Sequence, residues 1–129
     1  MSKNSDVLRI LIIEDNQDAA ETLGELLELG GHEVKLAFDG AAGVAAVREA
    51  RADVVISDLG LPGELDGYAV ARALRADPAL RGVYLIALSG YASEDARRRS
   101  REAGFDLHLA KPPDIAKLER TLADLGRKP

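Results

Sequence analysis

Cysteine and tryptophan are absent from this chain of 129 residues, and aromatic residues make up only 4% of it. Without cysteine there can be no disulfide framework, no thiolate metal site and no thiol nucleophile. With so few aromatic side chains, the core has to be built from Ala, Leu, Val and Ile. The apolar fraction of 47% and the charged fraction of 30% are typical of a soluble globular protein.

Long apolar runs are also missing. The opening segment MSKNSDVLRILIIEDN has an apolar run of only about six residues followed directly by acidic residues, so it can be neither a signal peptide nor a membrane span. We therefore expect a cytoplasmic protein without a membrane partner. The net charge of -5 disfavours attraction to nucleic acid through bulk electrostatics, and we expect no direct binding to nucleic acid.

Apolar segments of strand length recur along the chain. The first, third and fourth are nearly continuous rather than alternating, which is typical of strands that are covered on both faces in a parallel sheet. The predicted strands are 8–13, 33–37, 53–57, 83–88 and 106–110.

A segment with helical spacing follows each predicted strand. This alternation predicts an α/β fold, a doubly wound five-stranded parallel sheet with helices on both faces. We expect the flavodoxin-like strand order 2-1-3-4-5 in a single domain over residues 1–129, with a core of about residues 8–125 between two short loose tails. The predicted helices are 16–29, 40–50, 67–76, 92–103 and 114–125.

Polar side chains follow four of the five predicted strands. Glu14 and Asp15 end the first strand, Asp58 the third, Ser89 the fourth and Lys111 the fifth. Ligands of doubly wound sheets bind outside the carboxyl ends of the strands, where the strand order reverses. With the first strand between the second and the third, the three carboxylates are expected to meet in one crevice.

The chemistry of these residue types indicates phosphoryl transfer. Three neighbouring carboxylates repel one another unless a cation neutralises them, and a hard divalent ion such as Mg²⁺ prefers such oxygen ligands. Asp58 can act as a nucleophile that forms an acyl phosphate. Ser89 can then donate to one phosphoryl oxygen, and the ammonium group of Lys111 can pair with another.

Each of these residues also has an ordinary structural interpretation. Asp58 could begin a loop or cap a helix, and Glu14 and Asp15 could favour the start of the first helix by their charge. Ser89 alone would be a turn residue and Lys111 a surface side chain. The complete set, in this chain order, favours the chemical interpretation.

The four motifs together resemble the receiver domain of two-component response regulators. They are LIIEDN, ISDLGLP, ALSGYA and HLAKPP, and the resemblance spans about residues 8–125. It implies that Asp58 accepts a phosphoryl group from a phosphohistidine of a histidine kinase or histidine phosphotransfer protein. It also implies a chain that is a phosphoacceptor switch rather than an enzyme, and that acts on a downstream protein partner.

The resemblance further implies a role for each residue of the motifs. Asp15, Asp58 and the backbone carbonyl of Gly60 would bind magnesium directly, with Glu14 acting mainly through water. Ser89 and Lys111 would hold the phosphate, and the Lys111–Pro112 bond would be cis, a geometry that X-Pro bonds allow. The list of site residues is thus Glu14, Asp15, Asp58, Gly60, Ser89 and Lys111.

Two departures from the family pattern are visible. One residue more than usual separates Pro62 from Asp66, so we expect an altered loop after the acceptor. His108 stands three residues before the lysine, where many receivers carry a Tyr or Phe that reports phosphorylation. His108 is therefore a switch candidate, although a lone His on a strand is most often a structural side chain.

Two other features have weaker functional interpretations. The run ARRRSRE at 96–102 could form a patch for an acidic partner, but a charged run on a helix is usually a solvated face. His32 is expected in a solvent-facing turn, without a second His nearby that would suggest a metal site.

Two alternative functions remain at this point. A magnesium-dependent phosphohydrolase would also form an aspartyl phosphate, but it would need an acid two residues after the nucleophile, where this chain has Gly60. The other alternative is a pseudo-receiver, a binding module that has lost phosphorylation. The complete set of acids disfavours it.

Overall fold

The computed structural model describes residues 7–90 and 93–126. Within them, five parallel strands form one sheet in the order β2-β1-β3-β4-β5, which confirms the predicted topology. The predicted tails and Ala92, the first residue of the predicted fourth helix, lie outside the described residues. The strands are β1 (Arg9–Ile13), β2 (Glu33–Ala37), β3 (Val54–Asp58), β4 (Tyr84–Ser89) and β5 (Leu107–Ala110).

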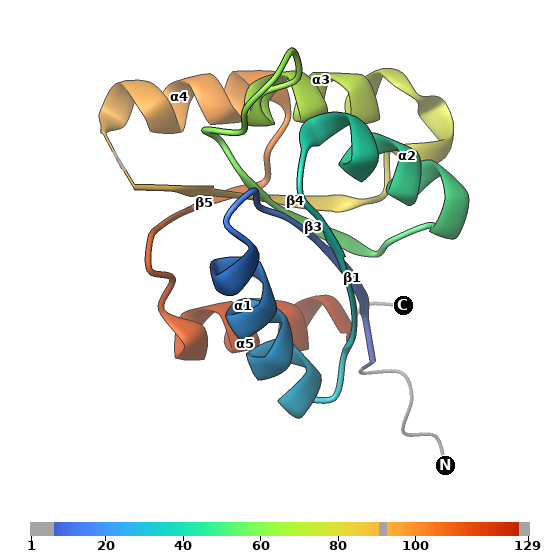
Figure 1. Ribbon diagram of the computed structural model, residues 1–129, viewed down its shortest axis with the longest axis vertical. Helices are drawn as coiled ribbons and strands as arrows, with labels where there is room; N and C mark the ends of the chain where they lie inside the picture. Colours follow the sequence, from blue (N-terminus) through green and yellow to red (C-terminus); the bar gives the residue numbers. More distant parts are fainter. Residues whose placement is uncertain (1–6, 91–92, 127–129) are drawn as a thin grey trace.

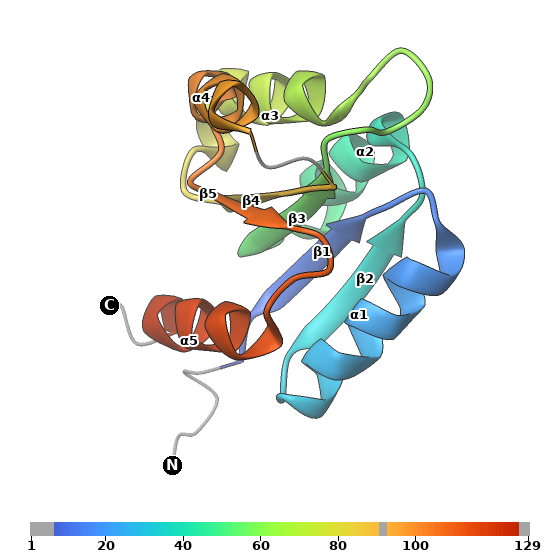
Figure 2. The same cartoon turned by 90° about the vertical axis from the view of Figure 1, so that its left-hand side faces the viewer.

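The helices cover both faces of the sheet. Helices α1 and α5 lie on one face, and α2, α3 and α4 lie on the other (Figures 1 and 2). None of the helices in the described ranges is long and apolar enough to cross a membrane. The helices are α1 (Gln17–Leu29), α2 (Gly40–Ala50), α3 (Gly67–Ala76), α4 (Glu94–Ala103) and α5 (Ile115–Gly126), and a 3-10 turn, η2, spans Pro78–Leu80.

The core consists of two apolar clusters, one on each face of the sheet. Every residue of β3 is buried, and alternate residues of the strand enter opposite clusters: Val55 packs toward α2 and α3, whereas Val54 and Ile56 pack toward α1 and α5. This double burial is the physical reason for the continuous apolar runs in the sequence. It also fixes the carboxyl end of β3 firmly between its neighbours.

The predicted bounds of β2, α2 and α3 are confirmed, and those of the other strands and helices differ from the observed ones by one or two residues. The sequence predicts Asp53 in the third strand, but β3 begins at Val54. The carboxylate of Asp53 accepts a hydrogen bond from the backbone nitrogen of Arg9 at 2.8 Å. The turn η2 was not predicted. It begins after Asp77, whose side chain accepts from the backbone nitrogen of Ala79, and Pro78 fits its first position.

The prediction for His32 was wrong. His32 is buried, with 9% of its surface exposed. Its Nδ1 accepts a hydrogen bond from the backbone nitrogen of Leu8 at 3.3 Å, and its Nε2 lies 3.5 Å from a carboxylate oxygen of Glu119. The ring therefore links the start of β1 to α5 instead of facing solvent.

Candidate functional site

Three carboxylates meet at the carboxyl edge of the sheet. Glu14 directly follows β1, Asp58 ends β3, and these two strands are paired with Ile13 opposite Ser57. One oxygen from each of Glu14, Asp15 and Asp58 lies within 4.8 Å of the other two. Glu14 and Asp58 are buried, with 4% and 9% of their surfaces exposed, whereas Asp15 is exposed.

Lys111 reaches into this carboxylate cluster from the end of β5. Its Nζ lies 2.6 Å from Oε1 of Glu14 and 3.1 Å from Oδ2 of Asp58. Burial lowers the pKa of Lys111, but hydrogen bonds and charge attraction to Glu14 and Asp58 outweigh it and leave the pKa raised. Lys111 is therefore a permanent cation at this edge. The Lys111–Pro112 peptide bond is cis, as the resemblance implied.

Backbone groups fix both buried carboxylates. The backbone nitrogen of Gly60 donates to Oδ1 of Asp58 at 3.0 Å, and that of Asn16 donates to Oε2 of Glu14 at 3.0 Å. Asn16 is also the N-cap of α1. A Cβ atom on Gly67 would lie 2.4 Å from the backbone oxygen of Asp58, so only glycine lets α3 begin so close to the end of β3.

The loop after Asp58, for which an altered shape is predicted, has buried and exposed parts. Leu61 is buried in the core cluster, and Leu65 packs against the same cluster. Between them the chain is exposed, and Gly63 has a φ of 88°, a left-handed conformation that favours glycine. The loop thus keeps two apolar anchors while its tip projects outward.

Ser89 and His108 lie on neighbouring strands and are both buried. Ser89 ends β4, and its backbone oxygen accepts a hydrogen bond from the nitrogen of Lys111 at 2.9 Å. His108 is opposite Ala87 in the sheet, and its Nδ1 lies 3.3 Å from Oγ of Ser100 on α4. Burial lowers the pKa of His108, and the positive charge of Arg97 lowers it further. His108 thus contacts α4, not the carboxylate cluster.

The donor set suits a hard divalent cation. It consists of carboxylate oxygens close together on an open edge of the sheet, the ligand type that Mg²⁺ prefers. The exposed carboxylate of Asp15 provides the side from which an ion and its waters could enter. Two of the three acids are buried, so an added positive charge would offset the repulsion between them.

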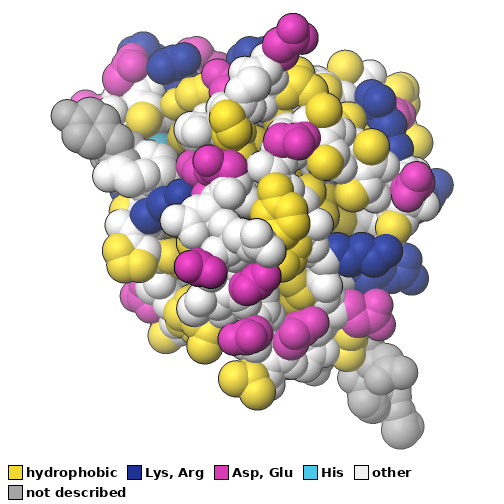
Figure 3. Space-filling model, viewed as in Figure 1, with side chains coloured by type: hydrophobic (Ala, Val, Ile, Leu, Met, Phe, Trp, Pro, Cys, Tyr) yellow, Lys and Arg dark blue, Asp and Glu magenta, His cyan; other side chains and the backbone are white. Residues whose placement is uncertain are grey.

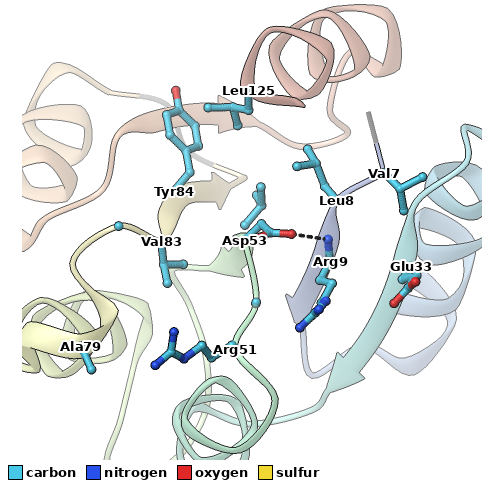
Figure 4. Close-up of a pocket in the computed structure, with 13 residues that line it drawn as sticks. Val7, Leu8, Arg9, Glu33, Arg51, Asp53, Ala79, Val83, Tyr84 and Leu125 are labelled. Atoms are coloured by element: carbon cyan, nitrogen blue, oxygen red, sulfur yellow. Dashed lines mark hydrogen bonds between the residues drawn. The ribbon is translucent and has the colours of Figure 1, made fainter. Parts of the chain in front are cut away.

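A larger hollow at the opposite end of the sheet carries no such chemistry. It has a volume of about 980 Å³ and lies at the amino ends of the strands (Figure 4). Its charged side chains are of both signs, Arg9 and Arg51 against Glu33 and Asp53, and Asp53 is occupied by the backbone nitrogen of Arg9. The carboxyl edge therefore remains the candidate site.

Comparison with known proteins identifies the family. Residues 10–123 match the family model described as "Response regulator receiver domain". The chain belongs to this family. Its members are the receiver domains of two-component systems, and they act as phosphoacceptor signalling switches.

Two curated relatives show how this receiver domain compares in length. It is 37% identical over 120 residues to the transcriptional regulatory protein PrrA of Mycobacterium tuberculosis, covering 93% of this chain and 50% of PrrA. It is 36% identical over 104 residues to the gliding motility regulatory protein of Myxococcus xanthus, covering 81% of this chain and 13% of that protein. The chain thus spans half or less of these relatives.

A solved structure confirms the fold. The receiver domain of the sensor histidine kinase PA1611 from Pseudomonas aeruginosa PAO1 matches with a TM-score of 0.84 and 34% identity, covering 94% of this chain and 98% of that one. That structure holds a magnesium ion in its active site cleft. Receiver domains bind Mg²⁺ at an acidic site, and this receiver domain has a Glu-Asp-Asp cluster.

Sequence reasoning missed some residues that shape the surroundings of the site. Asn16 and Gly67 position the carboxylates through the backbone, and a capping Asn or a Gly at a helix start is too common to indicate this role. Ser100 lies within an arginine-rich run, which indicates a solvent-exposed helix face. In the structure only 1% of its surface is exposed. Its contact with His108 is visible only in three dimensions.

Proposed function

We propose that this receiver domain accepts a phosphoryl group on Asp58 from a phosphohistidine of a histidine kinase or histidine phosphotransfer protein. The observation that carries the proposal is the placement of the Asp58 carboxylate. One oxygen accepts from the backbone nitrogen of Gly60, the other contacts the ammonium group of Lys111, and 12% of the side chain remains exposed. The carboxylate is therefore oriented and reachable.

The transfer requires a nucleophile and groups that stabilise the transferred charge. A carboxylate oxygen of Asp58 forms a bond to phosphorus while the bond from phosphorus to the donor imidazole breaks, and its electron pair returns to the ring nitrogen. Lys111 lies 3.1 Å from Asp58, so its charge can pair with a phosphoryl oxygen. Ser89, at the end of the adjacent strand β4, supplies a hydroxyl on the same edge.

The same edge would hold magnesium. Glu14, Asp15 and Asp58 have the right oxygen donors, with Glu14 acting mainly through water and the backbone carbonyl of Gly60 as a further ligand. When bound, the ion would neutralise charge between the carboxylates and the phosphoryl group. Glu14 is held by Lys111 and by the backbone nitrogen of Asn16, which keeps its carboxylate beside that of Asp58.

A hollow beside the carboxylates supports docking of the phosphodonor. It has a volume of about 590 Å³, reaches from Glu14 to Lys111, and is otherwise lined mainly by apolar atoms. The α1 side of this hollow exposes Leu26, 39% of whose surface is accessible. Acidic side chains of α1 gather on the neighbouring surface (Figure 3). A donor protein that places an apolar helix in the hollow and basic residues beside it would therefore fit.

Phosphorylation by a small donor tests the proposal directly. We expect the protein, incubated with Mg²⁺ and acetyl phosphate, to gain the mass of one phosphoryl group by intact mass spectrometry. Asp58→Asn should abolish the adduct. Asp39→Asn is the matched control, because Asp39 follows β2 at the same edge and caps α2, a role that Asn fills equally well. An adduct that survives Asp58→Asn, or none in a protein shown to bind Mg²⁺, would refute the assignment.

Turnover separates this function from its rivals. A receiver holds at most one phosphoryl group per chain, whereas a phosphohydrolase on a related scaffold releases many phosphates from a substrate. Gly60 stands where such an enzyme would need an acid. A pseudo-receiver would show no adduct at all.

In the proposed function, phosphorylation of Asp58 alters the binding of a downstream protein partner by shifting the receiver domain between two pre-existing states.

A further inference from the structure

Strand β2 forms one open edge of the sheet. It is the last strand in the order β2-β1-β3-β4-β5 and pairs with β1 alone among the described strands. The backbone nitrogen of Glu33 and the backbone oxygen of Ala37 bond to residues that flank β1, so the odd-numbered residues of β2 direct their backbone groups toward β1. The backbone N–H and C=O groups of Val34 and Leu36 therefore face the open side, where a further strand can bind them.

Space is available beside this edge. A hollow of about 740 Å³ lies along it, lined by Glu33, Val34 and Lys35 of β2 and by residues of α1 and α2 on either side. Figure 1 views the molecule from the side of β2, and Figure 3 shows a band of hydrophobic side chains in the middle of the same face, between α1 and α2. The two helices therefore do not close over the strand.

The exposed charges of β2 are of both signs. Glu33 and Lys35 lie on one face of the strand, the α2 side, because Lys35 is opposite Leu11 of the cluster on that side. Neither forms an ion pair with another described residue. Charges on an edge strand normally prevent pairing with other strands. An acid and a base placed symmetrically about Val34 nevertheless suit one kind of strand, a second copy of β2.

We propose that two copies of this chain form a dimer in which their β2 strands pair antiparallel about a two-fold axis at Val34. In this register Val34 lies opposite Val34 of the other copy, and their outward backbone groups form two hydrogen bonds, one in each direction. Glu33 of each copy lies opposite Lys35 of the other. These flanking positions are where opposite Cα atoms approach to about 4.5 Å, so the side chains can form two ion pairs.

Other registers lack this match. A two-fold axis at Lys35 would place the two Lys35 side chains opposite each other, which is destabilising. An axis at Leu36 would place Lys35 opposite Ala37 and leave Glu33 without a basic partner. Parallel pairing in register would bring residues of like charge side by side. Charge complementarity therefore selects the axis at Val34.

The same register brings exposed apolar side chains together. Phe38 directly follows β2 and has 41% of its surface exposed, and Leu29 at the end of α1 has 84% exposed. Gly30 and Phe38 are equally far from Val34 along the chain, so the alignment directs Phe38 of one copy toward Gly30 of the other, next to Leu29. A strand this short buries a small area, and we expect a weak, concentration-dependent dimer.

The dimer does not depend on the proposed function. Because the paired strands are antiparallel, the carboxyl edges of the two sheets point in opposite directions. Asp58 ends β3, which is separated from β2 by β1. Neither candidate site therefore lies at the interface between the copies.

Charge reversal tests the pairing. Sedimentation velocity of the full chain over a series of concentrations should show the wild type passing from monomer to dimer. Glu33→Lys or Lys35→Glu changes both ion pairs from attraction to repulsion and should raise the dissociation constant of the dimer by roughly thirtyfold. Glu102→Lys and Lys117→Glu are the matched controls, because they reverse exposed charges on α4 and α5. They should leave the dissociation constant close to that of the wild type.

Mixing the two reversed variants gives the sharpest result. Glu33→Lys has two basic side chains on β2 and Lys35→Glu has two acidic ones, so an equal mixture should form a heterodimer about as tight as the wild-type dimer. The double variant should again form a homodimer. Recovery in the mixture also shows that both variants fold. A wild type that stays monomeric at every concentration, a dimer that neither reversal weakens, or a mixture without recovery would overturn the proposal.

Hydrogen exchange locates the interface. The amide of Val34 faces the open edge and should exchange more slowly as the concentration rises and the dimer forms. The amide of Lys35 faces β1 and should change little, so it is the internal control. Protection of β5 or α5 without protection of Val34 would show that another surface holds the copies together, and this too would overturn the proposal.

Discussion

Helices α4 and α5 flank the same edge strand, β5, from opposite faces of the sheet, and they are held in opposite ways. Helix α5 inserts Leu118 and Leu122 into the core, where neither has any exposed surface. Helix α4 buries a serine and an alanine and depends on polar contacts. Helix α5 is held by the burial of apolar area, which is not directional. Helix α4 is held by polar contacts that need a specific geometry, which a small change can break.

The helices on the two faces of the sheet therefore contribute differently to the candidate site and to the core. The α1 and α5 face provides the stable support from which Lys111 reaches Glu14 and Asp58, since Lys111 lies between β5 and α5. Helix α4 contributes only Ala103 to the apolar core on its own face of the sheet.

Truncating a fully buried leucine of α5 should have the largest effect. We expect Leu122→Ala to lower the free energy of unfolding by about 3 kcal/mol, because it leaves a cavity in a fully buried position. The matched change on α4, Ala103→Gly, should cost only about 1 kcal/mol, which is the intrinsic helix penalty. Chemical denaturation measures both. Equal losses would show that α4 is anchored by packing after all.

The two helices also differ in how much of their packing the sequence predicts. The spacing of Ile115, Leu118 and Leu122 predicts an amphipathic helix, and the structure has α5 within one residue of the predicted bounds. The Arg-rich spacing of α4 also predicts a helix. It cannot show that Ser100 is buried, because its partner His108 is on a different element and the contact depends on how α4 crosses the sheet.

The candidate site was predictable for a topological reason. Carboxyl ends of parallel strands lie at one edge, so once β1 is placed beside β3, Glu14 and Asp58 have to be neighbours. The bond of Lys111 to Glu14 was not foreseen, since the sequence suggested only a phosphate partner for it. Strand order does not determine which carboxylate the long side chain of Lys111 contacts. The contact depends on how far the side chain extends across the edge of the sheet.

Removing the guanidinium group of Arg75 should have the next largest effect. This group donates to the carboxylate of Asp106 and to the backbone oxygens of Arg81, Val83 and Gly104. We expect Arg75→Ala to lower the free energy of unfolding by about 2 kcal/mol, because the carboxylate of Asp106 and the backbone oxygens of Gly104 and Val83 lose a charged donor. Arg75→Lys should recover less than half of the loss, since an ammonium group cannot make the planar fork of contacts. A full recovery in urea denaturation would mean that the positive charge alone matters and that the planar fork of contacts adds nothing.

The smallest effect should come from the protonation of His108. Its pKa is lowered in the folded protein, by burial first and by Arg97 second, so the unfolded chain binds the proton more readily. Stability from this group is therefore complete above about pH 6.5, the ordinary pKa of His, and is lost as the pH falls below it, at up to about 1.4 kcal/mol per pH unit. Carboxylates titrate in every variant, so the loss of stability in the wild type has to be compared with that in His108→Phe. The free energy of unfolding of both is measured by denaturation at about pH 7.5 and about pH 5.5, on either side of the ordinary pKa of His. The wild type should lose more stability than His108→Phe over this interval. An identical loss would mean that the His108 ring is accessible to water in the folded state, and that neither burial nor Arg97 lowers its pKa.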